Sequence, residues 1–167
     1  NLSQKIAPKA TITALPLAVN HTYFKPKKDK KNKKIVIGTV SRILQFKGHD
    51  FVLKVIHSLP QSYKNKIEWQ IAGTGPYLKT LKKDVERLGL QEFVKFKGFL
   101  PDETLSDFYA NLDVFILATR ESRASTKIEG FGLVFLEAQA CGIPVIGTNT
   151  GGIPSAIAHK NGGWLIA

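Results

Sequence analysis

The sequence lacks the features that mark membrane-spanning and secreted proteins. Its longest apolar stretches, such as residues 133–136, are far shorter than the roughly 20 residues of a membrane-spanning helix. No segment has the basic start, apolar middle and small-residue cleavage site of a secretory signal. With Cys141 as the only cysteine, no internal disulfide forms, and we expect a reducing, cytoplasmic location. Methionine is absent and the chain begins at Asn1, so we expect a piece of a longer protein.

Acidic residues are also scarce, with 13 Asp and Glu against 24 Lys and Arg and a net charge of +11. The excess is concentrated in residues 25–34, KPKKDKKNKK, which hold seven lysines. Such a run is typical of a solvated linker, and the alternative is peripheral contact between Lys25–Lys34 and an anionic membrane. Aromatic side chains are not interleaved within the run, so stacking on a nucleic acid is not expected.

From residue 35 onward, short apolar runs alternate with helical patterns. Strands are predicted at residues 35–40, 67–72, 93–96, 113–118, 144–147 and 164–166. Helices are predicted at residues 48–59, 76–88, 101–112 and 132–141, with a short one after 151–154. Repeated strand–helix units predict an α/β, doubly wound, Rossmann-like parallel sheet with helices on both faces. Residues 1–24 do not fit this alternation, and residues 11–15 are a candidate strand of a neighbouring domain.

Helical spacing predicts which side chains are buried. The stripe expected for the first helix is Phe51, Val52, Val55, Ile56 and Leu59. The stripe expected for the third is Leu105, Phe108, Tyr109 and Leu112. Glu137 lies in a helix that is otherwise almost wholly apolar, so its carboxylate needs partners. These are either an internal Lys or Arg or the hydroxyl groups of a ligand.

Glycine and charged residues follow the predicted strands at the edge where such sheets bind ligands, the carboxyl ends of the strands. Arg42 and Lys47 follow the first strand, and residues 73–76 and 99–102 follow the second and third. Residues 129–132, EGFG, lie between the fourth strand and its helix. Here glycines allow close backbone approach, and the helix N-terminus that follows is suited to phosphate.

These blocks resemble the C-terminal domain of the family 4 retaining glycosyltransferases of the GT-B fold. Glu129 and Glu137 have the spacing of that family's paired glutamates, with seven residues between them. Further blocks are similar along nearly the whole chain: LPLAVNHTYFKP, VSRILQFKG, IAGTGP, FKGFLPDETLSDFYANLDVFIL, IGTNTGGIPSAI and NGGWLIA. The resemblance implies one half of a two-domain enzyme. Residues 1–34 would be an interdomain linker and 35–167 the donor-nucleotide domain, with the N-terminal acceptor domain and the last helices missing.

The resemblance also implies a role for each site residue. Arg42, Lys47, Leu133 and Val134 would bind the donor diphosphate, while Phe99, Leu100 and Asp102 would line the base. Glu137 would accept hydrogen bonds from the ribose. Glu129, Gly130, Phe131 and Gly132 would hold the donor sugar, with Glu129 as the catalytic group.

The family is metal-independent, so no cofactor is expected; the donor would be a UDP-, GDP- or ADP-sugar and the acceptor a glycan or glycolipid. No Asp-x-Asp motif or cluster of metal-ligating histidines is present, and all four histidines, His21, His49, His57 and His159, are interpreted as surface residues. Two alternatives stay open: a sugar-nucleotide epimerase of the same architecture, and a non-catalytic module that binds nucleotides or anionic surfaces. As a glycosyltransferase half, the chain is expected to be inactive alone.

Overall fold

A parallel six-stranded sheet lies at the centre of the computed structural model, which describes residues 11, 17–27, 33–120 and 130–167. The strands are β1 (Ile35–Val40), β2 (Ile67–Ala72), β3 (Val94–Gly98), β4 (Val114–Leu117), β5 (Val145–Thr148) and β6 (Gly163–Ile166). Their order is β3-β2-β1-β4-β5-β6, and every neighbouring pair is parallel. The predicted fold class is confirmed. The strand order reverses between β1 and β4, and in sheets of this kind ligands bind at the carboxyl ends of the strands near such a reversal.

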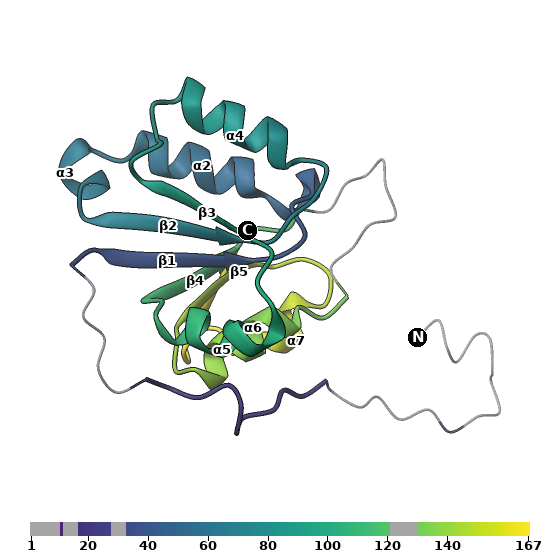
Figure 1. The fold of residues 1–167 in the computed structure, drawn as a ribbon. Helices are drawn as coiled ribbons and strands as arrows, with labels where there is room; N and C mark the ends of the chain where they lie inside the picture. The colour runs from purple at the N-terminus through teal and green to yellow at the C-terminus, as the bar shows by residue number, and fades with distance from the viewer. Residues whose placement is uncertain (1–10, 12–16, 28–32, 121–129) are drawn as a thin grey trace.

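Helices cover both faces of the sheet (Figure 1). The helices of one face are α2 (His49–Ser58), α3 (Gln61–Lys64) and α4 (Leu78–Arg87). Those of the other face are α5 (Asp102–Ala110), α6 (Leu133–Ala140) and α7 (Ile153–Ala156). The sequence did not predict α3 or the single 3-10 turn η1 (Gln45–Lys47), because elements of three or four residues are too short to show a period.

The buried face of α2 differs from the predicted stripe. Phe51 and Val55 are 41% and 45% exposed, so their expected burial is wrong. The buried residues are instead His49, Val52, Leu53 and Ile56. His49 and Leu53 are one turn apart, and the His49 ring stacks on the buried Trp69 of β2 with centroids 6.4 Å apart. The helix is therefore rotated toward Trp69, leaving two apolar side chains at the surface.

Aromatic side chains fill the core on the α5–α7 face. Tyr109, Phe115 and Phe135 are fully buried, one each from α5, β4 and α6, and each contributes on the order of 1.5–3 kcal/mol by leaving water. Leu105 and Phe108 pack beside them, so the predicted stripe of α5 is confirmed. Phe24, from the segment expected to be a linker, belongs to the same cluster and is only 9% exposed. Figure 1 shows this segment, residues 17–27, running along the α5–α7 layer on the side away from the sheet.

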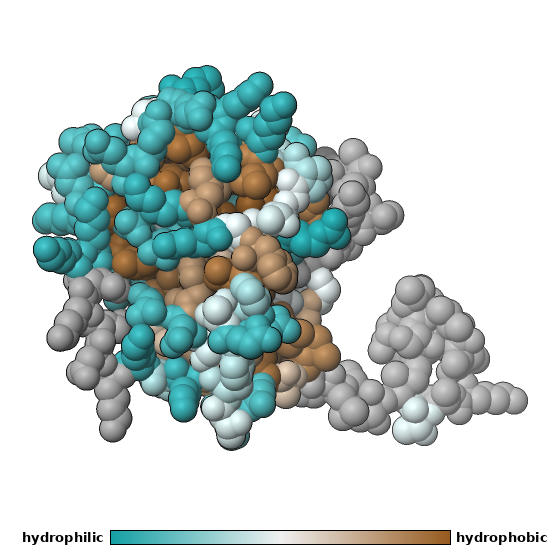
Figure 2. Space-filling model, in the orientation of Figure 1, coloured by the Kyte–Doolittle hydropathy of each residue, from teal (hydrophilic) through white to brown (hydrophobic). Residues whose placement is uncertain are grey.

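The outer surface of the α2–α4 layer is hydrophilic, as Figure 2 shows over α4. Lys79, Lys82 and Lys83 all lie on this helix. Within the described residues, no helix is long and apolar enough to cross a membrane. Most of the candidate strand at residues 11–15, and part of the lysine run, lie outside the described residues.

Candidate functional site

The loops at the carboxyl ends of β1, β2 and β3 are joined by backbone hydrogen bonds. Ser41 N donates to Ala72 O at 3.1 Å, and Gly73 N donates to Gly98 O at 2.6 Å. A Cβ on Gly73 would lie 1.9 Å from the carbonyl oxygen of Ser41, so only glycine permits this approach. The edge of the sheet is thus a fixed backbone surface in its first half.

A pocket of about 270 Å³ opens on this surface and brings together four of the predicted site residues. Arg42 lies on one side, and Phe99, Leu100 and Asp102 lie on the segment that enters α5. Its other lining residues are Val40, Ser41, Ala72, Gly73, Thr74 and Leu105. Phe99 is 72% exposed. The pocket has apolar walls and one exposed cation at its margin, a combination suited to an aromatic base carrying an anionic group.

Two cations lie near the switch point besides Arg42. Within the described ranges, no carboxylate pairs with Arg42. Lys47 lies on η1, and its ammonium group is 5.4 Å from the centroid of the Phe46 ring. Lys47 does not line the pocket. Arg120, which the sequence analysis did not single out, follows β4 and forms an ion pair with Asp50 at 2.6 Å. That ion pair fixes the β4 edge to the start of α2.

Helix α6 follows β4 and begins at the same edge of the sheet. Gly132 is its N-terminal cap in the left-handed conformation, with φ 82°, and a glycine has no side chain to cap the helix. The first N–H groups of a helix have no intrahelical acceptor, so those of Leu133 and Val134 are available to an anion. A Cβ on Gly152 would lie 1.9 Å from the carbonyl oxygen of Gly130. The residues that lead into α6 therefore pack directly against the loop after β5.

Glu137 lies half-buried on α6 and accepts a hydrogen bond from the hydroxyl of Tyr109, with an Oη–Oε2 distance of 2.6 Å. The pKa of the Glu137 carboxyl is raised overall. Burial is the main cause and nearby Asp102 adds to it, while the hydrogen bond from Tyr109 acts in the opposite direction. In the described part of the chain, no Lys or Arg forms an ion pair with Glu137. The internal partner expected from the sequence was a Lys or Arg, and Tyr109 was expected only as a core residue. The hydrogen bond from Tyr109 is therefore a partner that sequence reasoning missed.

The structure does not gather every predicted residue into one cavity. Lys47, Leu133, Val134, Gly130, Phe131, Gly132 and Glu137 do not line the pocket that holds Arg42. Asp102 connects the two groups, since it lines the pocket and lies close enough to Glu137 to raise the pKa of that carboxyl. Glu129, predicted to be the catalytic group, lies outside the described residues.

The interpretation of His49 as a surface residue is wrong. Its side chain is 1% exposed, its Nε2 lies 3.2 Å from the hydroxyl of Ser41, and its Nδ1 is buried without a partner among the described residues. Burial lowers the pKa of His49 to about 4, so the ring is neutral at pH 7. The other three histidines are exposed, as predicted. His49 therefore supports the loop after β1 from below, through Ser41.

Metal ligands are not clustered in the described residues: they contain no group of three or more His, Cys, Asp or Glu side chains placed to hold an ion.

Comparison with known proteins gives one family. The family model described as glycosyl transferases group 1 matches residues 21–167. A curated relative, the GDP-mannose-dependent alpha-(1-6)-phosphatidylinositol monomannoside mannosyltransferase of Mycolicibacterium smegmatis, is 32% identical over 95% of this chain. The alignment covers 44% of that relative, so the chain spans less than half of its length.

Solved structures share the fold. The C-terminal domain of a glycosyl transferase group 1 family protein (LpcC) from Francisella tularensis superposes with a TM-score of 0.73 and 27% identity, covering 89% of this chain and 80% of that one. Anabaena Alr3699/HepE in complex with UDP-glucose gives a TM-score of 0.75 with 25% identity, covering 90% of this chain and 42% of that one.

Proposed function

The chain belongs to the group 1 glycosyltransferases, with the fold of a GT-B C-terminal domain, and on that premise we propose that it is the donor-binding half of a retaining hexosyltransferase. The observation that carries the proposal is the pocket at the carboxyl edge of β1–β3. It joins Arg42, which has no carboxylate partner among the described residues, to the apolar segment before α5. Apolar walls with a cation at the margin fit a nucleobase followed by phosphate.

The diphosphate would lie between Arg42 and the N-terminus of α6. Arg42, Lys47 and the N–H groups of Leu133 and Val134 supply positive potential from side chains and from the helix dipole. A leaving nucleoside diphosphate gains negative charge during transfer, so these groups would stabilise the transition state more than the ground state. No divalent cation is then required, and we propose a metal-independent reaction.

The base, ribose and sugar would each meet a different element. Phe99, Leu100 and Asp102 would line the base, and Glu137 would accept hydrogen bonds from the ribose hydroxyls. Gly130, Phe131 and Gly132 would offer backbone N–H groups to the donor sugar. The role of Glu129, close to the reacting carbon of the sugar, rests on its spacing from Glu137 alone.

The relatives support a proposal for the donor and acceptor classes. The Mycolicibacterium relative is named for GDP-mannose and for phosphatidylinositol monomannoside, and Anabaena HepE was solved with UDP-glucose. We therefore propose a UDP- or GDP-hexose donor and a glycan or glycolipid acceptor bound by a second domain. The enzyme would work on the cytoplasmic side of a membrane, with Lys25–Lys34 against anionic headgroups.

Calorimetry with this chain tests the proposal. GDP, UDP and ADP are titrated in EDTA and again with magnesium, beside a single-stranded RNA oligonucleotide. We expect one nucleoside diphosphate to bind with similar affinity in both buffers, and no binding of RNA beyond what rising salt removes. Binding of RNA but of no nucleotide would contradict the donor-site proposal, and a strong magnesium requirement would contradict metal independence.

A further inference from the structure

The hydrogen bond between Tyr109 and Glu137 joins the core of the domain to its candidate ligand site. Tyr109 is fully buried, and its hydroxyl donates to Oε2 of Glu137 at 2.6 Å. Glu137 itself is only half-buried, on a helix whose N-terminus lies at the ligand-binding edge. A buried donor thus holds one oxygen of a carboxylate that is partly open to solvent.

The Tyr109 ring has little freedom to move. It packs against Phe24 with centroids 5.8 Å apart, against Phe108 at 6.1 Å and against Phe115 at 5.7 Å. Phe115 in turn packs edge-on against Phe135 of α6, at 5.5 Å. Close-packed aromatic rings leave one rotamer, so the hydroxyl has one position relative to α6.

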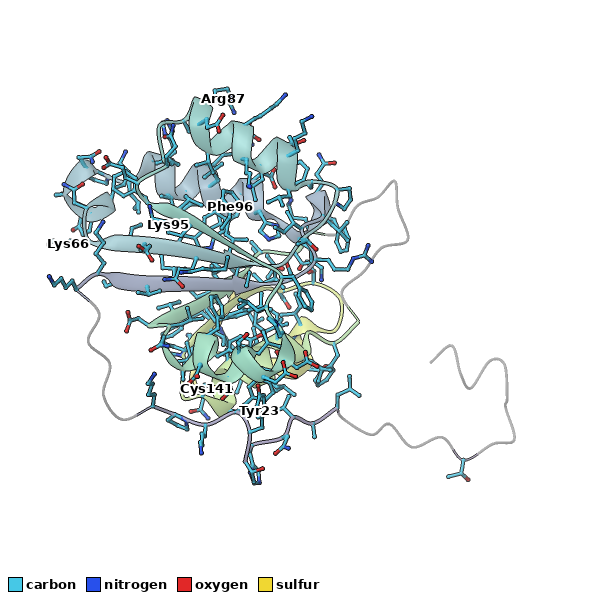
Figure 3. The ribbon with its side chains drawn as sticks, viewed as in Figure 1. Tyr23, Lys66, Arg87, Lys95, Phe96 and Cys141 are labelled. Carbon is cyan, nitrogen blue, oxygen red and sulfur yellow. The ribbon has the colours of Figure 1, made fainter. Side chains whose placement is uncertain are left out.

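Helix α5 is also held at its start. Tyr23, labelled in Figure 3 beneath α5, donates its hydroxyl to the backbone oxygen of Asp102, and Ser106 Oγ donates to Tyr23 O at 2.7 Å. Asp102 lines the pocket. The same helix therefore carries a wall of the pocket at one end and the partner of Glu137 at the other. The segment that crosses it holds both in place.

A fixed hydroxyl has two effects on the carboxylate. It occupies Oε2, which leaves Oε1 with free lone pairs, and it favours the ionised form, which accepts hydrogen bonds. Burial and the neighbouring Asp102 act in the opposite direction and raise the pKa of Glu137. Burial and the charge of Glu137 raise the pKa of Tyr109 well above its usual value, so Tyr109 keeps its proton and stays a donor.

We propose that Tyr109 is a positioning residue for nucleotide recognition: by holding Oε2 of Glu137, it presents Oε1 to the ribose hydroxyls. This inference rests on the proposed function, and it adds a residue that does not touch the ligand. Its consequence is selectivity for ribose over deoxyribose, because a carboxylate held in one geometry loses more when the hydroxyls it binds are missing.

The test compares ribonucleotides with dideoxynucleotides in calorimetry. GDP and 2′,3′-dideoxy-GDP, and UDP with its dideoxy analogue, are titrated into wild type, Tyr109→Phe, Glu137→Gln and the double variant. For whichever of GDP and UDP binds better, the affinity of wild type should be about tenfold higher than for the dideoxy analogue. In Tyr109→Phe this ratio of affinities should fall to about threefold or less. In the Glu137→Gln background, Tyr109→Phe should change the ratio no further, because the two residues act as one unit.

A ratio measured within one protein separates positioning from folding, because partial unfolding weakens both nucleotides equally. Tyr63→Phe, at a tyrosine that is 61% exposed, is the matched control and should keep the wild-type ratio. Glu137→Asp is a second variant that needs no change in the core. It retracts the carboxylate by one methylene, and it should lose as much preference as Tyr109→Phe.

Three results would overturn the inference, and they differ from a failure of the proposed function. If Tyr109→Phe keeps the full ribose preference while Glu137→Gln abolishes it, or if Glu137→Asp keeps it, Tyr109 is a core residue only. Additive losses in the double variant would also contradict a shared role. If wild type binds no nucleotide at all, the proposed function itself fails, and this inference fails with it.

Discussion

The two halves of the sheet differ in charge and in the way they are held together. Residues 33–98, with β1–β3 and α2–α4, contain thirteen Lys and Arg against five Asp and Glu. Residues 99–167, with β4–β6 and α5–α7, contain four against seven. In the first half, backbone hydrogen bonds join the loops at the edge of the sheet; in the second, a chain of aromatic rings joins a strand to two helices.

This difference indicates a division of roles within the proposed donor site. The basic half supplies Arg42 and a backbone surface, which suit an anion and a flat base. The acidic half supplies the Glu137 carboxylate, held by Tyr109, and the N-terminus of α6. A nucleotide sugar bound across the crevice would therefore meet positive charge from one half and hydrogen-bond acceptors from the other. Each half can be tested by its own substitutions.

The largest effect is expected at the contact between the halves, where Gly48 meets the end of β4. Gly48 has φ 75°, and a Cβ there would lie 1.8 Å from the carbonyl oxygen of Ala118. Gly48→Ala should lower the free energy of unfolding by about 3 kcal/mol or more, because the clash is with backbone. Gly89→Ala is the matched control: φ is 65° with nothing within 4 Å, so only the conformational cost of about 1–2 kcal/mol remains. Urea denaturation measures both, and equal losses would contradict a close approach at Gly48.

Burial of Phe24 is the next test, since it asks whether residues 17–27 belong to the second half. Phe24→Ala removes a ring that is 9% exposed and packed on Tyr109, and it should cost about 3 kcal/mol. Phe51→Ala, in the first half, removes a ring that is 41% exposed and should cost less than about 1 kcal/mol. If the two variants unfold at the same urea concentration, residues 17–27 behave as a linker.

The sequence predicted the strands and the long helices well, because short apolar runs mark buried strands and helical spacing recurs over two or more turns. It also placed Arg42, Phe99, Leu100 and Asp102 at one edge of the sheet, where a pocket joins them. What it missed depends on contacts between distant segments. Three features are of this kind: the rotation of α2 toward Trp69, the burial of His49, and the hydrogen bond between Tyr109 and Glu137. Each depends on elements that no local sequence pattern connects. Helical spacing predicts that Tyr109 is buried, but it does not predict that its hydroxyl donates a hydrogen bond to Glu137.

Acid should lower the free energy of unfolding, because His49 in the first half is buried in its neutral form. The pKa of this ring falls from 6.5 to about 4 on folding, so between these values the unfolded chain binds more protons than the folded one. The stability that the neutral His49 ring contributes is fully present above pH 6.5 and is lost as the pH falls toward 4. His49→Gln should remove about 2–3 kcal/mol of the difference in unfolding free energy between pH 7 and pH 4.5. Urea denaturation at the two pH values measures it, and His57→Gln, at an exposed histidine, should leave the difference unchanged.

The smallest effect is expected at Arg42, where the charge of the first half meets the ligand. Arg42 is exposed and lines the pocket without a carboxylate partner in the described residues, so its charge is available but partly screened by water. Arg42→Ala should weaken the bound nucleoside diphosphate about tenfold, or about 1.4 kcal/mol, and leave the affinity for the parent nucleoside nearly unchanged. Lys54→Ala, which removes the same charge from the exposed face of α2, controls for the overall potential of the basic half and should change the affinity less than about twofold. Calorimetry at low and at physiological salt separates the two explanations, because a contact made by Arg42 persists at higher salt whereas a general potential does not. If both variants lose the same affinity, and both losses disappear with salt, the first half attracts the nucleotide without binding its phosphates.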